Sequence, residues 1–189
     1  MADRVWITDV GPRDGLQNES NIVAASAKVA LIDALAGAGV PEVEATAFVS
    51  PKWVPQLADA ADVMAAIRRV PGVVYAALVP NEKGLERALR AGVDKISVFT
   101  AASEAFTKAN TNATINETLE RFKPVFEYCT SKGLPLRAYV STAVACPYDG
   151  PVAASQVARV VEQLLELGPC EIDLGDTIGV AHPSDIDAL

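Results

Sequence analysis

The sequence predicts an α/β fold in which strands and helices alternate along the whole chain. One sequence pattern recurs: a helical stretch ends at glycine, and a short strand rich in β-branched residues follows at once. It begins at Ala38, Ala91, Lys132 and Leu167, and a looser copy begins at Pro71. The strands are apolar on both faces, as strands are when helices cover a parallel sheet. No long linker interrupts the alternation, so a parallel architecture is expected.

Six strands are expected, and each helix between them should have a recognisable start or end. The strands span residues 4–10, 42–48, 73–79, 95–100, 135–142 and 171–175. Ser26 and Asn81 are expected to cap helices, Thr114 and Glu117 to form a capping box, and Pro124 to kink or break the helix after it. A further helix is expected over residues 156–167, with Val157, Val160, Val161, Leu164 and Leu165 on one face. Glycines 39, 92, 133 and 168 suit the left-handed position that ends a helix.

The last residues read as the start of another helix, with Ser184 as its cap and Ile186 and Leu189 as its first core residues. A (β/α)₈ TIM barrel needs eight such units and about 250 residues. We therefore expect residues 1–189 to form a single incomplete TIM-barrel domain, truncated after about six strands and lacking the last two βα units. The alternative is an open doubly wound sheet, but no G-x-G-x-x-G follows the first strand.

Composition limits the class of partner. Half of the 189 residues are hydrophobic and 21% are charged, which excludes a disordered chain. The formal charge of 16 − 24 = −8 disfavours nucleic acid as a partner but leaves room for an anionic small substrate. Three unpaired cysteines and the lack of a leader pattern predict a cytoplasmic protein. No apolar run is long enough to span a membrane, so no membrane partner is expected.

Polar residues gather where the strands are expected to end, which is the active face of a barrel. Arg13 and Asp14 follow the first strand and Glu44 belongs to the second, while Asp176 and Thr177 follow the sixth. We expect Arg13, Asp14, Glu44 and Asp176 to converge there, because carboxylates at apolar strand ends are usually paired or functional.

Arg13 and Asp14 form the sharpest pair. On an extended strand end their side chains should point apart, so that Arg13 stabilises an oxyanion while Asp14 ligates a hard divalent metal or accepts a proton. The alternative is an ordinary ion pair in a loop. For Glu44 and Asp176 the alternative is that each neutralises a basic residue of the barrel.

Three other features could serve either chemistry or structure. Cys146, before Pro147, is either a reactive thiol or, more commonly, a small core residue. His182 is the only histidine, and we expect it to be exposed or at the start of a helix, since one histidine cannot make a two-histidine metal site. The loop of residues 48–56 holds two prolines and Trp53, and it either walls a pocket or serves packing.

Together these segments resemble the 3-hydroxy-3-methylglutaryl-CoA lyase family. The matching stretches are VGPRDGLQNE, FVSPKWVPQ, TAASEAFTKAN, CPYDG and LGDTIGV, in the family's order from Val10 to Val180. RDGLQ alone indicates only the wider superfamily of metal-dependent barrel lyases and synthases. FVSPKWVPQ and CPYDG narrow the resemblance. Residue 47 is alanine where some members have serine.

The resemblance implies cleavage of 3-hydroxy-3-methylglutaryl-CoA to acetyl-CoA and acetoacetate with Mg²⁺ or Mn²⁺ and no nucleotide cofactor, in leucine degradation and ketone-body formation. It implies an acyl-CoA substrate and a possible homodimer. Asp14 matches the metal-ligand aspartate, Arg13 the arginine that stabilises the enolate, and Glu44 and Asp176 acids required in the site. Gln17 and Thr177 are expected, with Arg13, to bind substrate. The family's H-x-H pair, its asparagine ligand and its catalytic cysteine belong to a last third outside these 189 residues.

Two rival functions stay open at this point. One is a Claisen-type synthase that joins an acyl-CoA to a 2-oxo acid, against which Leu16 and the SPKWVPQ loop argue. The other is a non-catalytic fragment or truncated product, because most ligands of the family's metal lie outside the sequence.

Overall fold

The computed structural model describes residues 5–189, and the chain divides into two compact units, Met1–Ile96 and Ser97–Leu189. Six strands form one sheet in the order β1-β2-β3-β4-β5-β8, which is the order in which they follow one another in the sequence. The strands of the pairs β1·β2, β2·β3 and β5·β8 run parallel. The α/β class and the sequential strand order expected for a barrel are therefore confirmed.

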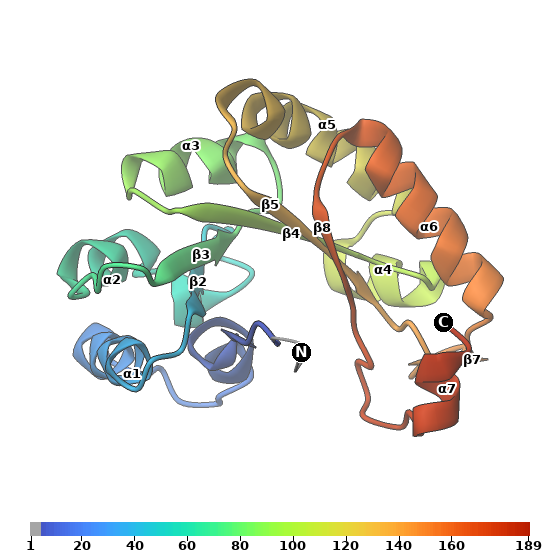
Figure 1. Cartoon of the computed structure of the whole chain (residues 1–189), viewed down its shortest axis with the longest axis horizontal. Coiled ribbons are helices and arrows are strands. Elements are labelled where there is room, and N and C mark those ends of the chain that lie inside the picture. The colour runs from blue at the N-terminus through green and yellow to red at the C-terminus, as the bar shows by residue number, and fades with distance from the viewer. Residues whose placement is uncertain (1–4) are drawn as a thin grey trace. The chain divides into compact units, whose positions relative to one another are not determined.

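In the first unit, short strands are followed by helices that lie against them (Figure 1). The strands are β1 (Thr8–Asp9), β2 (Glu42–Ala47), β3 (Val74–Leu78) and the start of β4 (Lys95–Ala101). The helices are a π-helical turn η1 (Gly11–Gly15), α1 (Ala25–Gly37), the 3₁₀ turn η2 (Pro55–Leu57), α2 (Ala60–Ala66) and α3 (Glu82–Arg90). Helices α1 and α2 pack on each other and on β2, whose six residues are all buried.

In the second unit, the rest of β4 leads into α4 (Glu104–Thr111) and α5 (Ile115–Lys132). The chain continues through β5 (Leu136–Ser141), a small antiparallel hairpin of β6 (Ala145–Cys146) and β7 (Gly150–Pro151), α6 (Ala154–Leu167), β8 (Glu171–Leu174) and α7 (Pro183–Asp187). Helix α6 packs on β5 and on α5, and α5 also contacts α4. None of the helices among residues 5–189 has the length and apolar character needed to cross a membrane.

Local signals placed several helix ends correctly. Asn81 caps α3 by accepting a hydrogen bond from the Gly84 amide at 3.1 Å, and Thr114 and Glu117 form both bonds of the capping box. Glycines 39, 92 and 133 have φ of 87°, 71° and 62°. These ends were predictable because each depends on contacts within one turn of chain.

Other element ends differ from the expectation. Helix α1 begins at Ala25, so Ser26 lies inside it, and α7 is capped by His182 rather than Ser184. Helix α5 runs through Pro124 without a break. Gly168 has φ 152° and ψ 174°, which is not the left-handed helical conformation. The strand expected at residues 4–10 is reduced to β1, and residue 4 lies outside the described residues.

The apolar faces were predicted less evenly. On α6, Val157, Val160 and Leu164 are buried as expected, but Leu165 is 49% exposed. Ile186 and Leu189 are also exposed, so they are not core residues in this chain. The buried face of α6 is therefore narrower than the periodic pattern of its apolar residues predicted.

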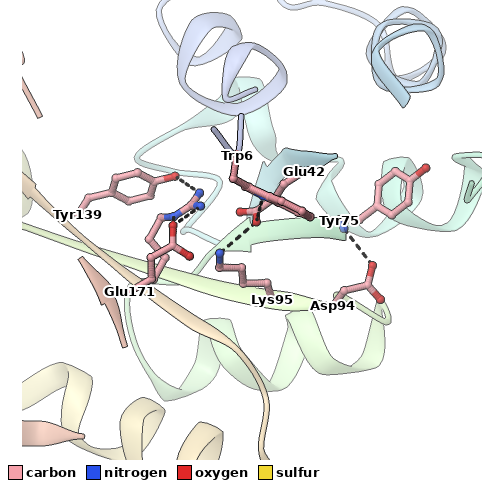
Figure 2. Close-up of polar contacts among 8 residues, drawn as sticks. Trp6, Glu42, Tyr75, Asp94, Lys95, Tyr139 and Glu171 are labelled. Atoms are coloured by element: carbon pink, nitrogen blue, oxygen red, sulfur yellow. Dashed lines mark hydrogen bonds and ion pairs between the residues drawn. The ribbon is translucent and has the colours of Figure 1, made fainter. Parts of the chain in front are cut away.

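Each unit also buries charge. In the first unit, Lys95 of β4 donates to Glu42 of β2 over 3.0 Å, and Trp6 donates to the same carboxylate at 3.3 Å (Figure 2). In the second unit, Arg137 of β5 donates to Glu171 of β8 at 2.9 and 2.6 Å. Buried ionic groups are tolerated only when paired, and these pairs tie neighbouring or next-neighbouring strands together.

Candidate functional site

The first part of the site is a turn that wraps around one carbonyl group. Directly after β1, the amides of Arg13, Asp14 and Gly15 all point at the carbonyl oxygen of Val10, at 3.1, 2.7 and 3.5 Å. The Gly11 amide donates to the Asp9 carboxylate at 2.9 Å, and a Cβ on Gly11 would meet that oxygen at the same distance. Single π-helical turns of this kind are often found at functional sites. This turn fixes the backbone from which Arg13 and Asp14 project.

Arg13 bridges two carboxylates at this turn. Its Nε donates to Oε1 of Glu44, and its Nη1 donates to Oδ1 of Asp14 at 2.7 Å. The Arg13 side chain is 11% exposed, that of Glu44 is fully buried and that of Asp14 is 55% exposed. The guanidinium therefore has a buried carboxylate on one side and a solvent-accessible one on the other.

The relation of Arg13 to Asp14 differs from the expectation. Their side chains were expected to point apart on an extended strand end, but they follow a helical turn and form an ion pair. The alternative of a loop ion pair is thus correct for the geometry. It does not remove a chemical role, because Arg13 also contacts buried Glu44, and an exposed pair alone would contribute little to stability.

Glu44 lies inside β2 rather than at its end. The pairing of β2 with β3 shifts register between Glu44 and Thr46, where an extra residue interrupts the ladder. Such a bulge re-aims the side chains beside it, and here the Glu44 carboxylate meets Arg13 from 31 positions earlier in the chain. Glu44 thus does neutralise a basic residue, and that residue is itself a candidate catalytic group.

Asp176 and Thr177 belong to the second unit, just beyond β8. The Asp176 carboxylate accepts hydrogen bonds from the amides of Val180 and Ala181 at 3.2 and 2.9 Å, which shapes the loop that follows. Thr177 accepts from the Thr142 amide at 2.7 Å and donates to the Gly175 carbonyl at 3.4 Å. Arg13, Asp14 and Glu44 meet within the first unit, while convergence of Asp176 with them stays a prediction.

Gln17 lies on the wall of a surface cavity in the first unit. The cavity has a volume of about 340 Å³ and two walls, formed by residues 17–20 with Ile22 and by residues 53–56. Trp53, on the second wall, is 71% exposed. The loop of residues 48–56 therefore does wall a pocket. Gln56, also on this wall, is only 3% exposed, and no sequence pattern had marked it as different from its neighbours.

The cysteines have contrasting environments. Burial raises the pKa of Cys129 and of Cys170 to about 11. Burial also raises the pKa of Cys146, but hydrogen bonds from Ser103 and from the amides of Asp149 and Tyr148 outweigh it, so the pKa lies below its usual value. The Ser103 hydroxyl is 3.1 Å from the Cys146 sulfur. Cys146 is 2% exposed, which agrees with the core residue expected as the commoner case.

His182 is exposed at the start of α7, as expected, and donates its amide to Asp185 at 2.7 Å. Among residues 5–189, no three histidine, cysteine, aspartate or glutamate side chains lie close enough to hold a metal ion together. The one candidate ligand singled out by the sequence, Asp14, would need ligands from elsewhere, since Mg²⁺ takes six oxygen ligands including waters.

Comparisons with known proteins agree with the motifs. The HMGL-like family model matches residues 4–189. The chain is 51% identical over 183 residues to mitochondrial hydroxymethylglutaryl-CoA lyase of Rattus norvegicus, covering 97% of this chain and 56% of the relative. It is 51% identical over 180 residues to a protein of Pseudomonas aeruginosa named 3-hydroxy-3-isohexenylglutaryl-CoA/hydroxy-methylglutaryl-CoA lyase, covering 95% of this chain and 60% of the relative.

A solved structure gives the same result for the fold. The crystal structure of the HMG-CoA lyase from Brucella melitensis superposes with a TM-score of 0.95 at 53% identity, over 99% of this chain and 66% of that one. The chain thus spans a little more than half the length of the rat relative and about two thirds of the Brucella one. The resemblance read from the motifs is confirmed, and the chain belongs to the HMGL-like family.

Proposed function

We propose that this chain provides the Arg13–Asp14–Glu44 part of a carbon–carbon lyase that cleaves 3-hydroxy-3-methylglutaryl-CoA to acetyl-CoA and acetoacetate. The observation that carries the proposal is the buried contact between Arg13 and Glu44. It holds a cation beside an accessible carboxylate, next to the carboxyl end of β1, in a chain whose relatives are named for this reaction.

The reaction needs a base, a stabiliser of negative charge and an acid. A base removes the proton of the tertiary hydroxyl, and the C2–C3 bond breaks. Its electron pair passes to C2 and the thioester carbonyl as an enolate, while the former carbinol carbon becomes the ketone of acetoacetate. Protonation of C2 then completes acetyl-CoA. The family resemblance places that proton donor, a cysteine, outside these 189 residues.

Arg13 is proposed to stabilise the enolate. Its guanidinium keeps a fixed orientation because Glu44 and Asp14 hold two of its nitrogens. A cation that is already oriented stabilises charge as it develops, without reorganisation during the reaction. Glu44 is proposed as a positioning residue, since it is fully buried and reaches the reaction through Arg13.

Asp14 is proposed to accept the hydroxyl proton, and also to ligate the divalent metal that the family uses. Its carboxylate is 55% exposed and lies 2.7 Å from Arg13, so it is open to a substrate or a metal beside the arginine. A bound Mg²⁺ or Mn²⁺ would lower the pKa of the substrate hydroxyl. The described residues do not fit a resident metal by themselves, and the roles of Arg13 and Glu44 do not depend on one.

The finer parts of the proposal are supported by the family resemblance alone. They are Mg²⁺ or Mn²⁺ as the metal, substrate contacts from Gln17 and Thr177, a catalytic role for Asp176, leucine degradation and ketone-body formation as the context, and a homodimer. Two further parts rest on the sequence pattern instead: a cytoplasmic location, and a single barrel domain that residues 1–189 leave incomplete. The Pseudomonas relative is named for two acyl chains, so both are candidate substrates.

The test is a chimera in which the carboxyl-terminal third of the Brucella lyase follows Leu189. We expect it to release acetoacetate from 3-hydroxy-3-methylglutaryl-CoA in the presence of Mn²⁺. The isohexenyl analogue and, for a Claisen-type synthase, acetyl-CoA with a 2-oxo acid are assayed in parallel. A folded chimera that condenses the second pair and does not cleave the first would overturn the proposal.

A further inference from the structure

Gln56 connects the two walls of the 340 Å³ cavity in the first unit. Its side-chain oxygen accepts a hydrogen bond from the Val23 amide at 2.8 Å, and its side-chain nitrogen donates to the Asn21 carbonyl at 2.9 Å. Both ends of one carboxamide therefore bind the backbone of Asn21 and Val23, the two residues that flank Ile22 of the opposite wall. An amide that donates and accepts in this way fixes both the distance and the register of the two segments.

The backbone of Gln56 is held as firmly as its side chain. Lys28 of α1 is 2% exposed and donates both to the Gln56 carbonyl and to the Asp59 carboxylate, at 2.7 and 2.8 Å. A buried ammonium requires partners of this kind. Helix α1 thus anchors the end of the loop that carries Trp53. If Gln56 moved, the hydrogen bond from Lys28 to its carbonyl would be lost.

The start of the same loop is anchored by α3. Arg87 donates to the Val49 carbonyl at 3.1 Å and lies over the Phe48 ring, 5.5 Å from its centre. Gly84 allows this close packing, because a Cβ there would lie 2.9 Å from the Phe48 carbonyl oxygen. Contacts from α1 and α3 thus hold both ends of the loop, and Trp53 between them is 71% exposed.

The opposite wall of the cavity follows directly after η1, the turn that carries Arg13 and Asp14. Asn18 donates its side-chain amide to the Asp14 carbonyl at 2.9 Å, and the amides of Asn18 and Glu19 bond to Gly15 and Leu16 at 3.3 and 3.0 Å. The residues that Gln56 binds are thus three to five positions beyond Asn18. Through this short segment, Gln56 reaches the backbone of Asp14.

We propose that Gln56 is a positioning residue: its carboxamide holds in place the segment of residues 17–23, which forms one wall of the cavity through residues 17–20 and Ile22, and through Asn18 it holds the turn that carries Arg13 and Asp14. The cavity then receives part of the coenzyme A arm of the substrate, with Trp53 as a fixed wall. The ligand part rests on the proposed function, whereas the mechanical part stands on contacts within the first unit.

The test is Gln56→Met, which keeps the length of the side chain and removes both hydrogen bonds. Amide hydrogen exchange is measured residue by residue on the full 189-residue chain. We expect exchange at Val23 and at residues 13–20 to rise roughly tenfold, because two hydrogen bonds to this segment are lost, with Tyr75 of β3 unchanged. Gln163→Met makes the same change on α6 of the other unit and should leave residues 13–23 unaffected.

Coenzyme A binding is then followed by Trp53 fluorescence in a Trp6→Phe background. Gln56→Met should weaken it roughly tenfold, and Gln163→Met should not change it. Unchanged exchange at Val23, or an equal rise throughout the unit, overturns the mechanical part. Local loosening with unchanged coenzyme A affinity overturns the positioning role. If the parent chain binds no coenzyme A, the ligand part is overturned, while acetoacetate release by the chimera still decides on the proposed function and exchange decides on the mechanical part.

Discussion

The guanidinium of Arg13 donates from Nε to the carboxylate of Glu44, a residue 31 positions later that is fully buried in β2. This contact has two consequences. It supplies the partner that a buried carboxylate requires, and it fixes the arginine in a single orientation at a turn beside β1. The arrangement suits an arginine that stabilises negative charge developing at a fixed position in a bound substrate.

Replacing Arg13 should mainly reduce turnover. In the chimera with the Brucella carboxyl-terminal third, Arg13→Met should lower kcat by roughly 100- to 1,000-fold, the usual loss when one preorganised donor to an oxyanion is removed. KM should change much less, because the charge on the thioester oxygen grows only in the transition state. Steady-state kinetics measures both, with Arg121→Met on α5 as the control. A rise in KM at unchanged kcat would contradict the enolate role.

Breaking the buried pair of Lys95 and Glu42 should cost far more stability than breaking an exposed pair. Lys95→Met leaves the carboxylate of Glu42, which is 3% exposed, without its ammonium partner. The expected loss in the free energy of unfolding is about 3–5 kcal/mol. The matched control is Lys123→Met, because Lys123 and Glu120 pair on the surface of α5 at 49% and 66% exposure. That change should cost less than about 1 kcal/mol in urea denaturation.

The capping box of α5 should make stability depend on pH in a defined window. Hydrogen bonds from the Thr114 backbone and side chain lower the pKa of Glu117 from its ordinary value of 4.5. The ionised form is thus favoured in the folded state, so its stabilising contribution is present above pH 4.5 and is lost as pH falls through the folded pKa. Glu117→Gln should therefore destabilise the chain at pH 7, with the difference shrinking on acidification.

The partner in this box gives a separate measure. Thr114→Ala removes the acceptor of the Glu117 amide bond, which is 3.1 Å long, and should cost about 1 kcal/mol. Thermal unfolding at pH 7 and at pH 3 tests both variants. Equal losses for Glu117→Gln at the two values would show that its charge is not what caps the helix.

Predictability from the sequence followed the range of the contacts involved. The six strands and the caps at Asn81 and Thr114 depend on periodicity or on neighbours within three residues, and the structure confirms them. The backbone at residues 11–15 was expected to be extended, and this expectation was wrong. Nothing in the sequence GPRDG indicates that three of its amides converge on the Val10 carbonyl. The bulge after Glu44 depends on pairing with a strand about 30 residues later and left no local signal.

The candidate site shows the same division. Arg13, Asp14 and Glu44 were identified by residue type and position, but their mutual contacts were not. Gln56 was missed because glutamine in a loop is usually exposed, and only the fold reveals that its side chain is buried between Val23 and Asn21. A glutamine that directly follows Pro55 carries no mark of burial in a single sequence.

The 189-residue chain by itself should show no lyase activity and only weak metal binding. Asp14 is the one family metal ligand identified in it, and a single carboxylate with waters binds Mg²⁺ poorly. The proton donor expected for the enolate is also not among its residues. Acetoacetate release with added Mn²⁺ and metal binding by calorimetry are the measurements, with the chimera as the positive control. Clear turnover would mean that another described group does the work assigned to residues outside the chain.

The same chain should also associate in solution. At the end of β8, Leu174 is 41% exposed, and beyond it Ile178 and Val180 are 43% and 47% exposed; before β1, Val5 and Ile7 are 79% and 60% exposed. Apolar residues beside strands with an open edge favour pairing with another chain. Light scattering should therefore detect species larger than a monomer, and Ile178→Lys with Val180→Lys should reduce them because added charge opposes edge association. A monodisperse monomer for the unchanged chain would contradict this prediction.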